Sequence, residues 1–350
     1  MKNLVNILRS CLPTPVKTAL KPLYFALRNS SIGRSFRYYN DYHYDAWRFS
    51  SHAASDQAIK TQVNLRSLII LNAHCIEKGL SHHNPRTRFG QQHIVDVLKL
   101  LAEYSSRFGQ DQITAIGFDT LAAYIRFHQQ HGIQLESLEA SISKIAACNQ
   151  NNKVCSKGMG GAYEITRARI YSDGKIDIVP FLNSRHSIRH FDSHRVDQEL
   201  IRQAVSMAIT TPSVCNRQAW KARVFHDDSA KNAILAIQNG NRGFTELIDT
   251  VLIVTCDLDC FMSVAERNQP WIDGGMFSMT LLLALHSVGL GACCLNWCVE
   301  KDRDMQLRKL IRLPESEVVI MIIAVGHIPE KLMVARSARK PLEEVLFFEG

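Results

Sequence analysis

The segment Ser-Arg-His-Ser-Ile-Arg-His-Phe, residues 184–191, decides how the rest of the chain is interpreted. Arg185 and Arg189 lie on either side of Ser187. Guanidinium groups donate paired, charge-assisted hydrogen bonds to phosphate oxygens, and a hydroxyl group adds another. Basic octapeptides are also common on solvated surfaces. The segment therefore indicates a phosphate site only if the residues that follow support it.

Four more motifs follow in order and do support it. They are Pro212-Ser213-Val214-Cys215-Asn216-Arg217-Gln218-Ala219-Trp220, Asp273-Gly274-Gly275, Gly289-Leu290-Gly291 and the basic Arg339-Lys340-Pro341. In this order the motifs resemble the nitroreductase family of FMN-dependent oxidoreductases. The corresponding domain is expected to begin near residue 160, and the resemblance as a whole covers about residues 65–350.

The resemblance implies bound FMN and no metal. The phosphate needs cations, a role for Arg185, Arg189 and Arg339. Small polar groups suit the ribityl hydroxyls, an amide suits the pyrimidine edge, and a glycine-rich turn brings a backbone N–H close to flavin N5. The implied cofactor residues are Arg185, His186, Ser187, Arg189, Pro212, Ser213, Val214, Asn216, Gln218, Leu295, Asn296 and Arg339.

Further motifs resemble one branch of the family, the nitroreductase-type proteins associated with polysaccharide biosynthesis. These motifs are residues 240–244, 266–269, 273–277 and 295–297, with an N-terminal extension that includes His74–Gly79. The chain departs from common nitroreductases at Ala219, where proline is usual, and at Asn296-Trp297, where a glycine often stands. These departures argue against an open, promiscuous substrate face.

Three arginines are candidate substrate contacts: Arg217, Arg242 and Arg267. An internal ion-pair network of Arg242, Glu266 and Arg267 is an equally good interpretation. Cys215 fits a small packed residue or a redox thiol beside the flavin.

The resemblance implies a homodimer with FMN at the subunit interface, where Pro212–Val214 of one subunit reach the flavin of the other. The expected reaction is hydride transfer from NAD(P)H to flavin N5, then from the reduced flavin to a small-molecule acceptor. Two alternatives stay open: a module that binds FMN without turnover, and a membrane-surface assembly protein of polysaccharide synthesis. A separate dinucleotide domain is not expected, because neither Gly289-x-Gly291 nor Gly158–Gly161 has the strand–turn–helix context of a Rossmann fingerprint.

The 350-residue chain is 46% hydrophobic and 21% charged, a globular composition, with a net charge of +8. Residues 1–50 hold eight basic and two acidic residues, so 8 − 2 = +6 of this charge lies there. The near balance elsewhere argues against nucleic acid as a partner. A basic arm over residues 1–55 fits contact with an anionic membrane surface or packing on its own protein equally well.

Ten cysteines without a C-x-x-C pair, and no apparent signal peptide, indicate reduced thiols in a cytoplasmic protein. If residues 1–50 contact the inner face of the membrane, the protein would be a peripheral membrane protein. His74 and Glu77 share a helix face, but no H-x-x-x-H pair accompanies them and Gly79 is expected to end the helix before His82. A polar loop, in which Arg86 and Arg88 contact the second domain or an anionic ligand, is therefore favoured over a metal site.

The predicted fold is α+β, a mostly antiparallel sheet flanked by helices, over residues 160–350, after a helical region over residues 56–150. Helical spacing marks Leu65–Asn72 and Ile94–Leu101, and Asp197 is the predicted N-cap of another helix. A hairpin is expected over Glu164–Val179 with its turn at Asp173-Gly174. Central strands are expected at Val251–Thr255 and Val318–Val325, and a buried core or interface helix over Met276–Leu295.

Overall fold

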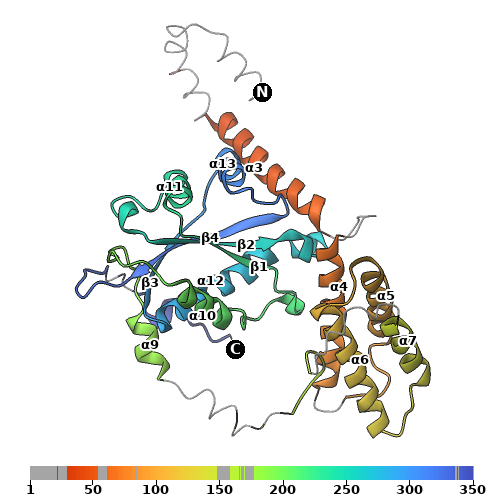
Figure 1. The fold of residues 1–350 in the computed structure, drawn as a ribbon. Helices are drawn as coiled ribbons and strands as arrows, with labels where there is room; N and C mark the ends of the chain where they lie inside the picture. Colours follow the sequence, from red (N-terminus) through yellow and green to blue (C-terminus); the bar gives the residue numbers. More distant parts are fainter. Residues whose placement is uncertain are drawn as a thin grey trace.

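The computed structural model describes residues 22, 30–53, 61–82, 85–147, 158–164, 166, 169, 177–335, 337 and 339–349. Its C-terminal half is the predicted α+β fold, built on one antiparallel sheet (Figure 1). The strand order is β1 (Trp220–Phe225), β2 (Thr250–Asp257), β4 (Glu317–His327) and β3 (Leu290–Leu295). All of β2 is buried, which confirms the two central strands predicted from continuous apolar runs.

Helices cover both faces of this sheet (Figure 1). On one face α10 (Gln198–Ala208) and α12 (Gln269–Ser287) pack against Leu252 and Val254 of β2. On the other face α11 (Asp228–Ile237) and α13 (Lys301–Ile311) pack against Val251 and Ile253. Successive residues of a strand point to opposite faces, so β2 contributes to two separate cores. Short 3-10 turns η2 (Thr245–Leu247), η3 (Leu258–Cys260), η4 (Val264–Glu266) and η5 (Leu342–Glu344) complete this half.

The prediction of one helix over Met276–Leu295 is wrong for the last part of that range. The helix α12 ends at Ser287, and Gly289 adopts a left-handed φ of 82° before β3 begins at Leu290. Glycine takes this conformation without a Cβ penalty, so it ends the helix and starts the strand. A continuous apolar run has no period that separates a buried helix from a buried strand.

The predicted hairpin over Glu164–Val179 lies largely outside the described residues. Its last two residues, Ile178 and Val179, belong to the short helix α9 (Ile178–Ser184), which contradicts the second strand. The next helix start is confirmed: the Asp197 side chain accepts a hydrogen bond from the backbone N–H of Glu199 at 2.9 Å.

A separate helical unit precedes this domain. It contains α4 (Gln62–Leu80), α5 (Gln91–Phe108), α6 (Gln112–Gln130) and α7 (Glu136–Ala147), and its core includes both apolar stripes predicted from spacing. Gly79 lies inside α4 rather than ending it. The position requires glycine because a Cβ there would meet the Phe89 ring at 2.1 Å. Within the described part of the chain, no helix is both long and apolar enough to cross a bilayer.

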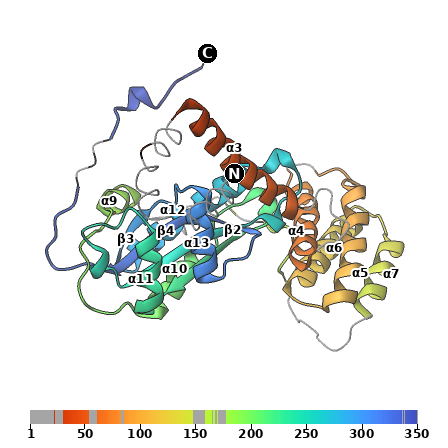
Figure 2. The ribbon, with the colours of Figure 1, turned by 90° about the horizontal axis from the view of Figure 1, so that it is seen from above.

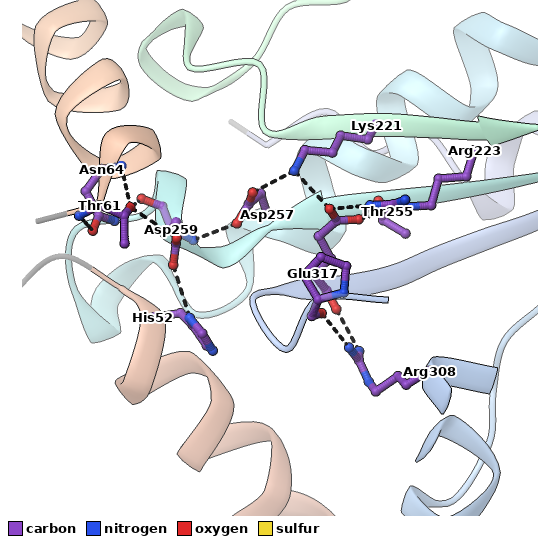
Figure 3. Close-up of polar contacts among 11 residues, drawn as sticks. His52, Thr61, Asn64, Lys221, Arg223, Thr255, Asp257, Asp259, Arg308 and Glu317 are labelled. Carbon is purple, nitrogen blue, oxygen red and sulfur yellow. Dashed lines mark hydrogen bonds and ion pairs between the residues drawn. The ribbon is translucent and has the colours of Figure 1, made fainter. Parts of the chain in front are cut away.

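A buried polar network joins α3 (Ser31–His52) and α4 to the sheet (Figure 3). The Glu317 carboxylate accepts hydrogen bonds from Lys221 at 2.9 Å, Arg223 at 2.6 Å and Thr255 at 2.7 Å. Lys221 also bonds to Asp257, whose carboxylate accepts from the backbone N–H of Asp259.

The Asp259 carboxylate in turn contacts His52 of α3 at 3.1 Å and Thr61, the N-cap of α4, at 3.2 Å. The two N-terminal helices are therefore fixed at the ends of strands β2 and β4.

We expect Glu317→Gln to lower the free energy of unfolding at pH 7 by about 1.5–3 kcal/mol, because the partly exposed Lys221 and Arg223 lose charge-assisted hydrogen bonds to a buried carboxylate. Burial alone would raise the pKa of Glu317, but hydrogen bonds from Arg223, Lys221 and Thr255 outweigh burial and lower this pKa. The stabilisation is therefore present above the unfolded pKa of about 4.3 and is lost as pH falls through the lower folded value.

Urea unfolding at pH 7 and at acid pH measures this effect. The control is Glu315→Gln, whose carboxylate is largely exposed and should change stability by less than about 0.5 kcal/mol. Equal losses in the two variants at pH 7 would contradict the role of Glu317.

Candidate functional site

The segment that carries the two arginines lies along the free edge of β3. Ser187 forms a parallel bridge with Ala292, and the backbone N–H of Ile188 donates to the Ala292 carbonyl at 3.0 Å. Ile188 and Phe191 are buried beneath it and anchor it to the core. A Cβ at Gly326 would lie 2.7 Å from the Phe191 ring, so this glycine makes room for the anchor. Sequence reasoning singled out the arginines and missed the two apolar anchors that alternate with them.

The guanidinium groups of Arg185 and Arg189 have no acidic partner among the residues that the structure describes. The Nη1 of Arg189 donates only a long hydrogen bond of 3.5 Å to the Ser187 carbonyl. Burial lowers the pKa of nearby His286, and the positive charges of Arg185 and His186 lower it further. Positive charge therefore gathers here without compensation, as an anion site requires.

A solvent-open hollow of about 280 Å³ lies beside these groups. Its polar lining comes from Ser184, Arg185, His186 and His286, and the Ser184 hydroxyl lies 2.7 Å from Nε2 of His286. Guanidinium, imidazole and hydroxyl donors suit a phosphate group. A second hollow, of about 460 Å³ beneath α3, is lined by Asp41, Asp45 and other residues, and its carboxylates do not suit an anion.

The Pro212–Gln218 loop has an unusual backbone. Cys215, Asn216 and Gln218 have left-handed φ values of 48°, 54° and 51°. This conformation costs a residue with a Cβ roughly 1–2 kcal/mol and persists only where the surroundings impose it. The Ser213 hydroxyl imposes it by accepting from the Gln218 N–H at 3.0 Å. The side chains of Asn216 and Gln218 are left exposed for a ligand.

The buried Asp273 and the half-buried Glu266 hold the same loop from below. The Asp273 carboxylate accepts from the Val214 N–H at 3.3 Å, which gives the Asp273-Gly274-Gly275 motif a structural role that the sequence did not reveal. Burial raises the pKa of Asp273, although the hydrogen bonds from Gln269 and Val214 oppose this. Glu266 receives the buried Arg217 guanidinium, with Nη1 and Oε2 3.0 Å apart.

The expected network of Arg242, Glu266 and Arg267 therefore does not form. Glu266 pairs with Arg217, whereas Arg242 and Arg267 are exposed, and Arg267 donates to the Val264 carbonyl at 3.4 Å. The partner of Glu266 is 49 residues away along the chain, a separation over which local charge patterns give no signal.

Three further predicted cofactor residues do not line the hollow beside Arg185. Leu295 is buried at the end of β3, and the carbonyl of the exposed Asn296 accepts from Gln238 at 3.0 Å. Arg339 is exposed and donates to the Ser337 carbonyl at 2.6 Å. No described contact brings Arg339 to Arg185, and Figure 2 shows the C-terminal end lying away from the sheet.

The helical unit forms a wall beside the 212–218 loop. Helix α4 packs against η1 (Val214–Asn216), and the Cys75 thiol is near enough to Cys215 for the two to interact electrostatically. Burial raises the pKa of Cys75, while the charge of Lys78 lowers it. Sequence reasoning did not place Cys75 or Lys78 next to this loop.

The pairing of His74 with Glu77 is structural. His74 Nδ1 lies 3.3 Å from one Glu77 oxygen, and the other accepts from the Gly161 N–H at 3.0 Å. Glycine is required at position 160 because a Cβ would meet the Ile116 carbonyl at 2.4 Å. The Gly158–Gly161 motif thus docks on the helical unit, and no group of side chains able to hold a metal ion occurs in the described ranges.

Comparison with known proteins agrees with this geometry. The nitroreductase family matches residues 182–248 and 249–327, the span that holds the arginine segment, the 212–218 loop and the sheet. The chain is 24% identical over 196 residues to an NADH dehydrogenase of Thermus thermophilus, covering 47% of this chain and 92% of that one. It is 23% identical over 193 residues to iodotyrosine deiodinase 1 of Homo sapiens, covering 47% of this chain and 66% of that one.

Among solved structures, an FMN-dependent nitroreductase of Clostridium difficile is similar, with 21% identity and a TM-score of 0.42 over 49% of this chain and 98% of that one. These matches cover about half of the chain or less, and the family match leaves the helical unit outside it. Residues 182–327 are therefore similar to the nitroreductase family.

The strain in the loop can be measured at Cys215. We expect Cys215→Gly to leave the free energy of unfolding nearly unchanged, because glycine adopts φ of 48° freely. Cys215→Val should lose about 1–2 kcal/mol relative to the glycine variant, since a β-branched residue pays the full left-handed penalty. Urea unfolding of both variants tests this, and equal stability would mean that the loop relaxes without strain.

Proposed function

We propose, from the nitroreductase-family match of residues 182–327, that the protein takes hydride from NAD(P)H and passes two electrons through FMN to a small-molecule acceptor. The observation that carries the proposal is that Arg185 and Arg189 have no acidic partner among the described residues and lie on the segment at the edge of β3, where Arg185 lines a hollow. When bound, FMN supplies the electron-accepting ring. The protein supplies binding, orientation and electrostatics.

Each predicted cofactor residue would contact a particular part of FMN. Arg185, Arg189 and the neighbouring His186 would bind the phosphate, with Ser187 close by. The exposed Asn216 and Gln218 would contact the ribityl chain and the pyrimidine edge from a loop already fixed in shape. Such a preformed loop lowers the entropy cost of binding.

Other members of the predicted set carry weaker support. Leu295 and Asn296 end the strand beside the arginine segment, so their backbone is the candidate to face flavin N5. Arg339 would reach the phosphate only if the C-terminal segment lies differently or on a second subunit. Pro212, Ser213 and Val214 would contact the flavin of that second subunit.

The substrate face is bounded by the helical unit. Because α4 packs against the 212–218 loop, the space above the flavin edge is narrower than the domain alone would leave. Arg217 is committed to Glu266, which leaves the exposed Arg242 and Arg267 as the freer substrate candidates. The motif resemblance favours an acceptor in polysaccharide biosynthesis, and a screen of sugar nucleotides, quinones and nitroaromatics for flavin reoxidation addresses it.

The homodimer has a candidate surface on α12. This helix exposes Trp271, Ile272, Met276 and Met279, although it is the central helix of one core. Neighbouring α10 exposes Met207. Exposed apolar side chains gathered on packed helices are typical of a subunit interface.

The cytoplasmic location and the membrane contact of residues 1–50 are also proposals. Their support is the charge of +6 over these residues, which would attract the anionic inner face of a membrane.

We expect Arg185→Ala and Arg189→Ala each to weaken FMN binding by about ten- to a hundredfold. A hydrogen bond to a charged group contributes about 1.5–3 kcal/mol, and about 1.4 kcal/mol is tenfold in affinity. Arg339→Ala should behave likewise where a second subunit brings Arg339 to the phosphate. Fluorescence titration of the apoprotein measures the affinity.

Two controls sharpen this titration. Riboflavin lacks the phosphate, so it should bind wild type and variants equally, and Arg202→Ala, an exposed arginine of α10, should bind FMN normally. Normal FMN affinity in all three test variants would refute the phosphate site. If NAD(P)H does not reduce the bound flavin of the holoprotein under anaerobic conditions, the protein binds flavin without catalytic turnover.

The dimer can be tested on α12. Light scattering should give about twice the 39.6 kDa chain mass, and Ile272→Asp should shift the protein toward monomer because a buried, unpaired carboxylate is costly. Met305→Asp, at an exposed site of similar area on α13, is the control. A wild-type monomer that holds FMN would contradict the shared site.

A further inference from the structure

Helix α3 has one face fixed to the protein. Tyr44 donates to Asp304 at 3.0 Å, Arg48 donates to the Glu315 carbonyl at 2.9 Å, and His52 lies 3.1 Å from Asp259. The fourth contact is from the Lys301 N–H to Asp41 at 3.3 Å. Residues 41, 44, 48 and 52 recur at helical spacing and so define a single inward face.

The opposite face of α3 carries a stripe of large side chains. Ile32, Phe36, Tyr39, His43 and Trp47, the outer stripe, recur at i, i+4, i+7, i+11 and i+15, roughly half a turn from the inward face. Ile32, Phe36, Tyr39 and Trp47 are 82%, 47%, 69% and 50% exposed. Figure 1 shows the N-terminal half of α3 projecting from the body of the molecule.

The acidic residues of this region lie on the inward side of the helix. Asp41 and Asp45, the only acidic residues in positions 1–50, line the hollow beneath α3 on its inward side. The outer stripe therefore contains no carboxylate. Lys2, Arg9, Lys17, Lys21 and Arg28 precede the helix in the sequence.

Aromatic side chains with basic residues and no acids have a specific chemical complement. Tyrosine and tryptophan place an apolar ring and a polar tip at the boundary between acyl chains and headgroups, and basic residues add attraction to anionic lipid. A protein partner with an acidic surface would complement the basic residues, but it would not require a row of aromatic side chains along one exposed helix.

We propose that the outer stripe of α3 lies in the headgroup region of a bilayer whose anionic lipids attract the net positive charge of residues 1–50. This rests on the membrane contact proposed above for residues 1–50 and identifies the surface that makes it. Because the inward face of α3 is bonded to the sheet, binding holds the whole domain at the membrane rather than a tethered arm.

The test compares variants of the full-length protein by sedimentation with vesicles of phosphatidylcholine and phosphatidylserine, or phosphatidylcholine alone. Phe36→Ser/Tyr39→Ser/Trp47→Ser should reduce partitioning onto the anionic vesicles by about tenfold or more, because binding scales with the apolar area inserted. Tyr163→Ser removes an 85% exposed tyrosine ring outside α3. It is the control for the triple variant and should bind the vesicles as wild type does. Unchanged thermal unfolding and FMN affinity show that the triple variant is folded.

Each outcome decides a separate point. Loss of vesicle binding in the triple variant with retention in Tyr163→Ser supports the outer stripe. Wild-type binding by the triple variant overturns it and leaves the membrane contact to the basic arm alone. A triple variant that loses the dimer by light scattering, with vesicle binding unchanged, assigns the stripe to a second copy and also overturns it. Failure of the wild type to bind anionic vesicles overturns the membrane contact itself, whatever the variants do.

Discussion

The carboxylate of Glu317 is the constraint on which the arrangement of the two halves depends. It lies at the first residue of β4, fully buried, with partners on β1 and β2. The backbone carbonyl of the same residue accepts from Arg308 of α13 and Arg48 of α3. A buried charge is tolerated only when fully paired, so these elements can meet only in this way. The positions of the β3 edge and of the 212–218 loop therefore depend on the contacts of Glu317.

The site combines two forms of preorganisation. At the edge of β3, apolar anchors hold Arg185 and Arg189 without giving them counter-charges. In the 212–218 loop, Asp273, Ser213 and the Arg217–Glu266 pair hold a backbone that is unfavourable on its own. Both arrangements cost stability in the free protein, and a phosphate-bearing ligand would recover part of that cost.

Much of the fold could be predicted from sequence because its signals are local. The apolar runs of β2 and β4, the N-cap Asp197 and the stripes of α4 and α5 each follow from a few consecutive residues. The apolar run from Met276 to Leu295 could not be divided, since the change from helix to strand depends on pairing of β3 with β4. The Arg217–Glu266 pair, the left-handed Cys215 and the contact of α4 with the loop were likewise hidden. Each depends on residues far apart in the chain.

The edges of the sheet limit how copies of this chain can associate. An open edge strand is a template for pairing with another chain, and proteins blunt it with charges or a covering segment. Here the β3 edge is covered at Ala292 by Ser187, and the β1 edge carries Lys221 and Arg223. Growth by adding strands from one molecule to the next is disfavoured at both ends. Association of copies through helical surfaces, such as the exposed side chains of α12, is therefore favoured over strand pairing.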